Sequence, residues 1–436
     1  MKSLVGLLLL LPTSVVASVL PTDFFTNSMI LAPLTRGGNL PFRRLCCDFG
    51  CKVSMGEMIF ARYLLQNDPV ERARLRRSSN EQCFGVQIAT NDAEEGVAAM
   101  KLAREAGADF VDLNCGCPIN EATRRGLGSA LLRNPKKLGN LVERMTRGAP
   151  DIPLTVKVRL GTSDNCINVL DVADHVTAAG AAALTIHGRS AMERYSSAAD
   201  WEKIEEVTNA VGSRIKVIGN GDIVSYAEGQ RRIATSGVDG VMVGRGALES
   251  PWIFDENGWE PDAAQRVNIY RRLAVYMKEH FGDDARGKRM ASYFLPWHFE
   301  FLCRHRPGKV SLQDRLSEFD DMPPLESLLA CKNPAAHKRI ADILWESGAD
   351  TDAKSSLFEF AESKIFSDIQ NNQYTPTNPL AELANIPKED KKVRKRKAPK
   401  PKRTQDEIDI VRAERKAKRE AAGITDFKHD DGKRRS

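Results

Sequence analysis

The 436-residue sequence lacks most of the features that would place it at once in a special class of proteins. Apart from an apolar stretch at its N-terminus, it has no hydrophobic run approaching the ~20 residues of a membrane span. Its nine cysteines are an odd number without a CxxC pair, which argues against a disulfide framework and predicts reduced thiols. With 42% hydrophobic and 28% charged residues, the composition argues against a collagen-like, coiled-coil or wholly disordered chain.

Surplus positive charge is missing from most of the chain and concentrated at its C-terminal end. The segment from Lys388 to Ser436 holds 19 of the 64 Lys and Arg and 10 of the 58 Asp and Glu, so it carries +9 and the remainder −3. Its basic run from Lys391 to Arg403 is almost free of apolar residues and is predicted to be disordered. A solvated tail, a nuclear-import signal and an electrostatic arm for nucleic acid would each fit it.

The N-terminus is the opposite kind of segment. Lys2 is followed by a leucine-rich run from Leu4 to Leu11, by Pro12 and by small residues around Ala17. This order predicts a secretory or organellar leader within residues 1–23, although an extension without consequence would also fit. The basic tail favours the cytoplasm or nucleus, so the two ends point to different compartments. We expect no stable membrane association.

Short apolar runs alternate with helical stretches between Met29 and Ala247. They are apolar throughout rather than alternating, which is typical of parallel strands covered on both faces. Eight such units in roughly 220 residues match a (β/α)8 TIM barrel. A doubly wound open sheet is the alternative, but no GxGxxG motif follows the first strand. The predicted strands are Met29–Leu34, Lys52–Gly56, Phe84–Ala89, Phe110–Asn114, Leu154–Val158, Ala182–Ile186, Ile215–Gly219 and Gly240–Gly244.

A polar or reactive residue lies at or just beyond the C-terminal end of every predicted strand, where barrel enzymes carry their catalytic groups. In chain order these residues are Thr35, Glu57, Gln87, Asn114 with Cys117, Lys157 with Arg159, His187 with Arg189, Asn220 with Asp222, and Arg245. Each alone has a structural explanation, such as a buried histidine or a turn-forming asparagine. A barrel without catalytic function would not need all of them, so together they predict an active site.

Two glycine-containing loops and one thiol stand out among these strand ends. The segments Gly219–Ile223 and Gly244–Ala247 would let backbone N–H groups and an arginine approach a phosphate. Cys117 lies in a Gly/Pro-shaped loop just beyond a strand and could act as a nucleophile or proton donor. Cys46, Cys47 and Cys51 are crowded, but their spacing disfavours zinc, and no metal is expected.

These motifs resemble those of the dihydrouridine synthases, flavin enzymes that reduce uridine in tRNA. The resemblance runs from about Met29 to about Trp345. It rests on Ala32–Thr35, Phe84–Gln87, Asp112–Pro118, Lys157–Arg159, His187–Arg189, Asn220–Asp222 and Gly244–Arg245, in this order. The sequences Gly38–Arg44 and His187–Ser190, with Arg194 and Tyr195, are similar to the eukaryotic branch that acts at position 47 of the tRNA variable loop. That branch often carries CCCH zinc fingers ahead of the barrel, where this sequence has the apolar segment.

The resemblance implies a role for each strand-end residue. FMN would be bound by Pro33, Leu34, Thr35, Gln87, Lys157, His187, Asn220, Gly221, Asp222, Gly244 and Arg245. NADPH would reduce the flavin, whose N5 hydride adds to C6 of uridine while Cys117 gives a proton to C5. Asn114, Arg159, Arg189, Arg124 and Arg125 would meet the substrate. The tRNA uridine must leave its stack to reach such a site.

The chain after Trp252 is predicted to be helical. The resulting domains are the leader over 1–23, an FMN-binding barrel over 24–261, a helical tRNA-binding domain over 262–364, and a linker with the basic tail over 365–436. The helical part also carries basic residues that could form a track with Arg124 and Arg125, or be ordinary surface charges. They are Arg271, Arg272, Lys288, Arg289, Arg304, His305, Arg306 and Lys309. We expect a monomer.

Two other functions compete with tRNA-uridine reduction. One is a small-molecule flavin oxidoreductase of the dihydroorotate or enoate reductase type, which gives the helical part and basic tail no purpose. The other is an RNA-binding barrel without catalysis, which the complete set of flavin and acid residues disfavours.

Overall fold

The computed structural model describes residues 22–308 and 322–371, and all of these belong to one compact unit. The predicted leader up to residue 21 and the basic tail from residue 372 therefore lie outside the described residues. No helix within the described ranges is long and apolar enough to cross a membrane.

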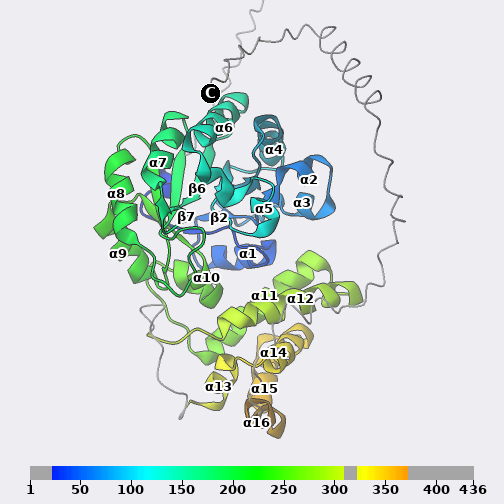
Figure 1. Ribbon diagram of the computed structural model, residues 1–436. Coiled ribbons are helices and arrows are strands. Elements are labelled where there is room, and N and C mark those ends of the chain that lie inside the picture. Colours follow the sequence, from blue (N-terminus) through cyan, green and yellow to red (C-terminus); the bar gives the residue numbers. More distant parts are fainter. Residues whose placement is uncertain (1–21, 309–321, 372–436) are drawn as a thin grey trace, which may run out of the picture. The chain divides into compact units, whose positions relative to one another are not determined.

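Eight parallel strands close into a barrel, which confirms the predicted TIM-barrel fold (Figure 1). Neighbours around the barrel follow chain order, and β1 closes the circle by pairing with both β11 and β2. Every strand runs the same way, so all C-terminal ends meet at one rim. The strands are β1 (Ser28–Leu31), β2 (Val53–Met55), β4 (Cys83–Ala89), β5 (Phe110–Cys115), β6 (Leu154–Arg159), β9 (Ala183–His187), β10 (Lys216–Asn220) and β11 (Gly240–Val243).

The first strand ends earlier than the sequence predicts. The N–H of Ala32 donates to the carbonyl of Val243 at 2.9 Å, and the next residue is Pro33. Proline has no N–H to continue the ladder, so the chain leaves the sheet there. Pro33, Leu34 and Thr35 consequently form a loop at the rim.

The other elements of the barrel are helices, short turns and three short strands. Local sequence signals explain where the helices begin and end. Asp92 caps α4 by accepting hydrogen bonds from the N–H groups of Glu94 and Glu95. Gly237 ends α9 in the left-handed conformation, with φ of 66°. The elements are η1 (Thr22–Phe25), α1 (Leu40–Asp48), β3 (Ile59–Phe60), α2 (Ala61–Leu65), α3 (Pro69–Ala73), α4 (Ala93–Glu105), α5 (Asn120–Thr123), η2 (Gly128–Arg133), α6 (Pro135–Gly148), β7 (Gly161–Ser163), β8 (Cys166–Ile167), α7 (Val169–Ala178), α8 (Trp201–Val211), α9 (Tyr226–Ser236), α10 (Arg245–Glu249) and η3 (Pro251–Phe254).

A helical segment follows the barrel, as the sequence predicts (Figure 1). A capping box between Asp262 and Gln265 starts its first helix. This helix packs on the barrel's α1, where the guanidinium of Arg44 lies 3.7 Å from the ring centre of Tyr276. The helices are α11 (Ala263–Phe281), α12 (Ala285–Leu302), α13 (Pro324–Ala330), α14 (Pro334–Glu346), α15 (Asp350–Ala361) and α16 (Lys364–Asn371), the last of which falls where the sequence suggested a linker.

Candidate active site

A cavity opens at the C-terminal rim of the barrel. All predicted cofactor residues except Thr35 and Gln87 line it, and they come from β6, β9, β10 and from the loops after β1, β10 and β11. The complete lining is Ala32, Pro33, Leu34, Lys157, His187, Tyr195, Asn220, Gly221, Asp222, Ile223, Met242, Gly244, Arg245 and Gly246. Closure of the barrel thus brings together residues that are more than 200 positions apart in the sequence.

A buried ion-pair cluster forms one wall of this cavity. The Arg189 side chain, only 1% exposed, donates from Nη2 to both carboxylate oxygens of Asp222, at 2.6 and 2.8 Å. Arg245 Nη2 donates to the same carboxylate at 3.1 Å, and the N–H of Ala199 donates to it at 2.7 Å. Asp222 adopts a left-handed φ of 56°, a conformation that Asp tolerates better than most residues. The cluster fixes the loop after β10 and orients Arg245 toward the cavity.

Lys157 and His187 face the cavity from neighbouring strands and are both desolvated. Lys157 Nζ donates to Oδ1 of Asn220 at 3.0 Å, and burial, followed by the charge of Arg159, lowers its pKa to about 8. Burial also lowers the pKa of His187 well below its usual value, with help from Lys157, Arg159, Arg189 and Arg245. His187 is therefore neutral at pH 7. Its Nε2 lies 3.3 Å from Arg189 Nη1, which can only donate, so the ring proton belongs on Nδ1.

The charges in the cavity suit an anionic ligand such as the phosphate of FMN. Of the charged residues that line it, Lys157 and Arg245 are cationic and Asp222 is anionic, and Asp222 is shared with Arg189. Burial lowers the pKa of Arg245 as well as that of Lys157, so this positive charge is held at an energetic cost. A bound phosphate would offset that cost.

Gly246 and Gly221 in the two glycine loops lie too close to neighbouring atoms for either to carry a side chain. A Cβ on Gly246 would lie 2.2 Å from the carbonyl oxygen of Ile223, and one on Gly221 would lie 2.5 Å from Cβ of Ala199. Gly221 also has a φ of 137°. The glycines therefore let the backbone after β10 and β11 form part of the cavity wall.

Cys117 lies beyond the end of β5 in a loop held by Asn114. Oδ1 of Asn114 accepts hydrogen bonds from the N–H groups of Gly116 and Cys117, at 3.2 and 2.9 Å. Burial raises the pKa of the Cys117 thiol, while the nearby charges of Arg159 and Lys157 partly oppose this. Cys115, by contrast, is fully buried in the core.

Thr35 and Gln87 lie at the edge of the site rather than in the cavity wall. Thr35 is exposed in the loop after β1, where the N–H of Arg36 donates to Oε2 of Glu57 at 2.8 Å. Gln87 is buried on β4, and its amide bonds to Asp112 and Asn114. Thr35 is next in sequence to the lining residue Leu34, but neither Thr35 nor Gln87 is among the lining residues.

The residues predicted to meet the substrate occupy different depths. Arg189 and Arg159 are buried, and Arg159 Nη1 donates to the carbonyl of Ser190 at 2.5 Å. Arg124 and Arg125 are exposed at the end of α5. The Arg125 guanidinium lies over the rings of Tyr63 and Phe60, 5.1 and 5.7 Å from their centres, so it is held in place at the surface.

Tyr195 lines the cavity but is not among the site residues predicted from the sequence. It is 56% exposed, stacks on His187 at a ring distance of 6.2 Å, and receives the Arg245 guanidinium 4.1 Å from its ring centre. Its position eight residues beyond His187, in a loop without regular structure, gave no periodic signal. The only sequence clue was its occurrence in the wording similar to the family.

Most of the described basic residues predicted to form a track on the helical segment interact within the protein, and Lys309 of that track lies outside the described residues. Arg271 pairs with Asp350 at 2.8 Å, Arg272 with Asp48 at 3.5 Å, and Lys288 with Glu346 at 2.7 Å. These pairs leave less free positive charge on the helices than the sequence suggests. No group of three or more His, Cys, Asp or Glu side chains within residues 22–308 and 322–371 is arranged to hold a metal ion.

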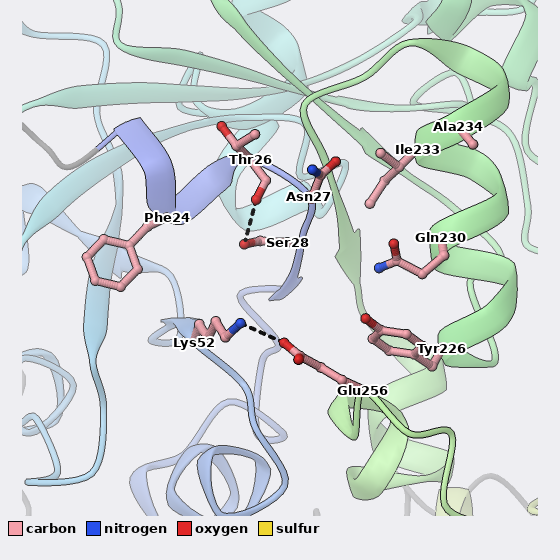
Figure 2. Close-up of a pocket in the computed structure, with 10 residues that line it drawn as sticks. All are labelled: Phe24, Thr26, Asn27, Ser28, Lys52, Tyr226, Gln230, Ile233, Ala234 and Glu256. Carbon is pink, nitrogen blue, oxygen red and sulfur yellow. Dashed lines mark hydrogen bonds and ion pairs between the residues drawn. The ribbon is translucent and has the colours of Figure 1, made fainter.

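A second cavity lies at the opposite, N-terminal end of the strands, between the start of β1 and α9 (Figure 2). An ion pair of 2.6 Å joins Lys52 to Glu256 at its edge, and Tyr226 and Gln230 project from α9 toward it. Barrel enzymes carry their chemistry at the other rim. We therefore place the candidate active site at the C-terminal cavity.

Comparison with known proteins agrees with this geometry. A family model described as dihydrouridine synthase (Dus) matches residues 30–319. A Coprinopsis cinerea protein named tRNA-dihydrouridine(47) synthase, NAD(P)(+), is 38% identical over 335 residues, which cover 72% of this chain and 50% of that protein. A Homo sapiens protein with the same name and the suffix "-like" is 39% identical over 332 residues, covering 73% and 50%. The chain thus spans about half the length of the curated relatives it matches.

Proposed function

The chain belongs to the dihydrouridine synthase family, and on this premise we propose that it reduces a specific uridine of tRNA to 5,6-dihydrouridine with NADPH. One observation carries the proposal: the buried thiol of Cys117, in the loop after β5, lies within electrostatic reach of Lys157 and Arg159, at the same end of the barrel as a cavity lined by Lys157 and Arg245. Reduction of the C5–C6 double bond requires a hydride and a proton. The cavity suits a cofactor that delivers the hydride, and the Cys117 thiol suits the role of proton donor.

FMN is the cofactor that the cavity fits best. Lys157 and Arg245 would meet its negative charge, the backbone of Asn220–Asp222 and Gly244–Gly246 would surround its phosphate end, and Pro33 and Leu34 would contact the ring. Gln87 and Thr35 would approach the ring from the edge of the site. When bound, FMN would supply the hydride for C6 of the uracil ring.

Cys117 would give the proton to C5. Its raised pKa keeps the thiol protonated at neutral pH, as a proton donor must be. The cations of Lys157 and Arg159 stabilise the negative charge that develops on the base and on the sulfur during transfer. Neutral His187, with its proton on Nδ1, can donate a hydrogen bond without adding a further positive charge.

Arginines at two depths would serve the substrate in different ways. Arg124 and Arg125 are exposed next to the Cys117 loop and would contact the tRNA backbone. Arg189 would act through Asp222, because its guanidinium is already held by that carboxylate. Asn114 would act through the Cys117 loop, and the helical segment after Asp262 would supply further tRNA contacts. The target uridine would be turned out of its stack to reach the rim.

The proposed target is position 47 of the variable loop, the position in the names of the relatives. The test is incubation of the full chain with FMN, NADPH and an unmodified tRNA transcript, followed by nucleoside mass spectrometry. A gain of two mass units on one uridine is expected, and it should disappear in a transcript carrying cytidine at position 47. No gain on any tRNA, or a folded protein that stays colourless after FMN is added, would contradict the proposal. A gain that survives the cytidine change would overturn only the position.

A further inference from the structure

A layer of buried polar side chains crosses the barrel beneath the Cys117 loop. Strand register places Gln87 of β4 opposite Asp112 of β5, and Asp112 opposite Thr155 of β6. Asn114 lies two residues beyond Asp112 and therefore projects from the same face of β5. The exposed fraction is 1% for Gln87 and Asp112, 3% for Thr155 and 8% for Asn114. Polar groups buried this deeply must bond to one another.

The hydrogen bonds in this layer form a chain with a direction. Asp112 accepts from Thr155 Oγ1 at 2.7 Å and from Gln87 Nε2 at 2.8 Å. Gln87 Oε1 then accepts from Asn114 Nδ2 at 2.7 Å. Asn114 Oδ1 in turn accepts from the N–H of Cys117 at 2.9 Å. The chain thus runs from a carboxylate in the barrel to the backbone of the reactive thiol.

The carboxylate sets this direction. An ionised carboxylate only accepts, so Gln87 must turn its NH₂ toward Asp112 and its oxygen toward Asn114. Asn114 must then turn its own NH₂ toward Gln87, which leaves its oxygen for the loop. With either amide reversed, two donors or two acceptors would face each other. An acceptor at position 112 therefore orients Gln87 and Asn114, and so provides the acceptor for the Cys117 N–H.

Asp112 is costly to keep in the barrel. Burial raises its pKa to about 6, and an apolar residue would pack at this position without that penalty. A fully bonded polar layer, by contrast, specifies one arrangement of its members. The free-energy cost of burying the Asp112 carboxylate is explained if the resulting arrangement positions Cys117 for the reaction.

We propose that Asp112 is a positioning residue for Cys117, acting through Gln87 and Asn114 to fix the loop that presents the thiol. This inference rests on the proposed function for its kinetic consequence, but the loop geometry can be measured independently of turnover. Asp112 itself touches neither cofactor nor substrate in this account.

The test compares three variants of the full chain. Asp112→Ala removes the acceptor of Gln87. Asp112→Asn retains it, because the Thr155 hydroxyl can rotate to accept from the new NH₂ while the amide oxygen still faces Gln87. Thr155→Val is the matched control, since it removes the other hydrogen bond to Asp112 but leaves the path to Cys117 intact.

Asp112→Ala is expected to lower kcat on the order of 100-fold, the loss typical of a reactive group displaced by about 1 Å, with little change in the KM for tRNA. Asp112→Asn should restore most of kcat, and Thr155→Val should retain it. The iodoacetamide alkylation rate of Cys117, followed by peptide mass spectrometry on protein without FMN, should change severalfold only in Asp112→Ala. Equal kcat and equal alkylation in Asp112→Ala and Thr155→Val would overturn the proposal.

Two further outcomes separate this inference from the proposed function. If the wild-type chain fails to reduce tRNA while the alkylation difference appears, the positioning role stands and the activity does not. If Asp112→Ala fails to fold, hydrogen exchange on the wild-type chain decides. A Cys117 amide that exchanges as fast as an exposed loop would show that Asn114 does not hold it, and would sink the proposal.

Discussion

The side-chain NH₂ of Asn39 lies 3.3 Å from Nε2 of His298, and this contact joins the barrel to the helical segment. Asn39 caps α1 and also donates to the carbonyl of Arg36 at 2.7 Å, in the loop that follows Pro33 and Leu34. The His298 ring is fully buried on α12 and stacks on Phe42 at 4.8 Å. The helical segment therefore packs directly on the loop beside the candidate active site.

This contact predicts a pH dependence of stability. Burial lowers the pKa of His298 to about 3, whereas an unfolded histidine has a pKa of about 6.5. As pH falls below about 6.5, His298 binds a proton in the unfolded state but not in the folded state. The free energy of unfolding therefore falls by up to about 1.4 kcal/mol per pH unit. His298→Gln keeps an acceptor for Asn39 but cannot titrate.

Urea unfolding of the wild-type chain and of His298→Gln at about pH 6.5 and 5.5 checks this expectation. The wild type should lose more free energy of unfolding on acidification than the variant. His337, whose pKa burial lowers to about 4, should leave a remaining slope in both proteins. Identical slopes would mean that His298 is accessible to protons in the folded state.

The proposed proton donor predicts a large effect from a small change. Cys117→Ala should bind FMN with unchanged affinity, because Cys117 is not among the cavity-lining residues, but should lose roughly 10²- to 10⁴-fold in turnover. Cys115→Ala is the matched control, since its thiol is fully buried two residues away. Single-turnover reduction of tRNA by the prereduced enzyme is the measurement. Equal rates in the two variants would remove Cys117 from the chemistry.

The lowered pKa of Lys157 predicts how cofactor binding depends on pH. With a pKa of about 8, the ammonium loses its proton as pH rises through that value, and its attraction for an anionic cofactor is lost with it. The Kd for FMN, measured by quenching of flavin fluorescence between about pH 7 and 9.5, should rise above pH 8. Lys157→Met should bind more weakly at pH 7 and show a flatter profile. A wild-type Kd that is constant over this range would contradict the assignment.

Gly128 packs against the backbone of Cys117, so a side chain added there tests whether the position of the Cys117 loop matters for turnover. Gly128 has a φ of 60°, and a Cβ there would lie 2.4 Å from the carbonyl oxygen of Cys117. Gly128→Ala should therefore displace the Cys117 loop and reduce turnover, in addition to the ~1–3 kcal/mol of backbone strain expected at such a position. Gly107→Ala is the control, because Gly107 has a φ of 88° with nothing within 4 Å of the added Cβ. The midpoint temperature of thermal unfolding should fall in both variants, whereas turnover should fall only in Gly128→Ala. A matching loss of turnover in Gly107→Ala would refute the steric explanation.

Local signals in the sequence were enough to predict the barrel. Its strands are runs of apolar residues because both faces are buried, and its helices begin and end at residues such as Asp92 and Gly237 that satisfy the helix ends locally. Strand boundaries were less certain, as the early end of β1 before Pro33 shows. The helix α16 was missed because its short sequence carries a single buried apolar residue, Phe366.

The sequence by itself also determined which residues meet at the rim, since parallel strands place all their C-terminal ends together. The tertiary structure alone decided what each of them does there. It buried Arg189 against Asp222, placed Tyr195 over His187, and connected Asp112 to Cys117 through two amides. These relationships depend on distances between side chains from different strands and loops. Such distances are set by strand register and packing, and they cannot be predicted from any short stretch of sequence.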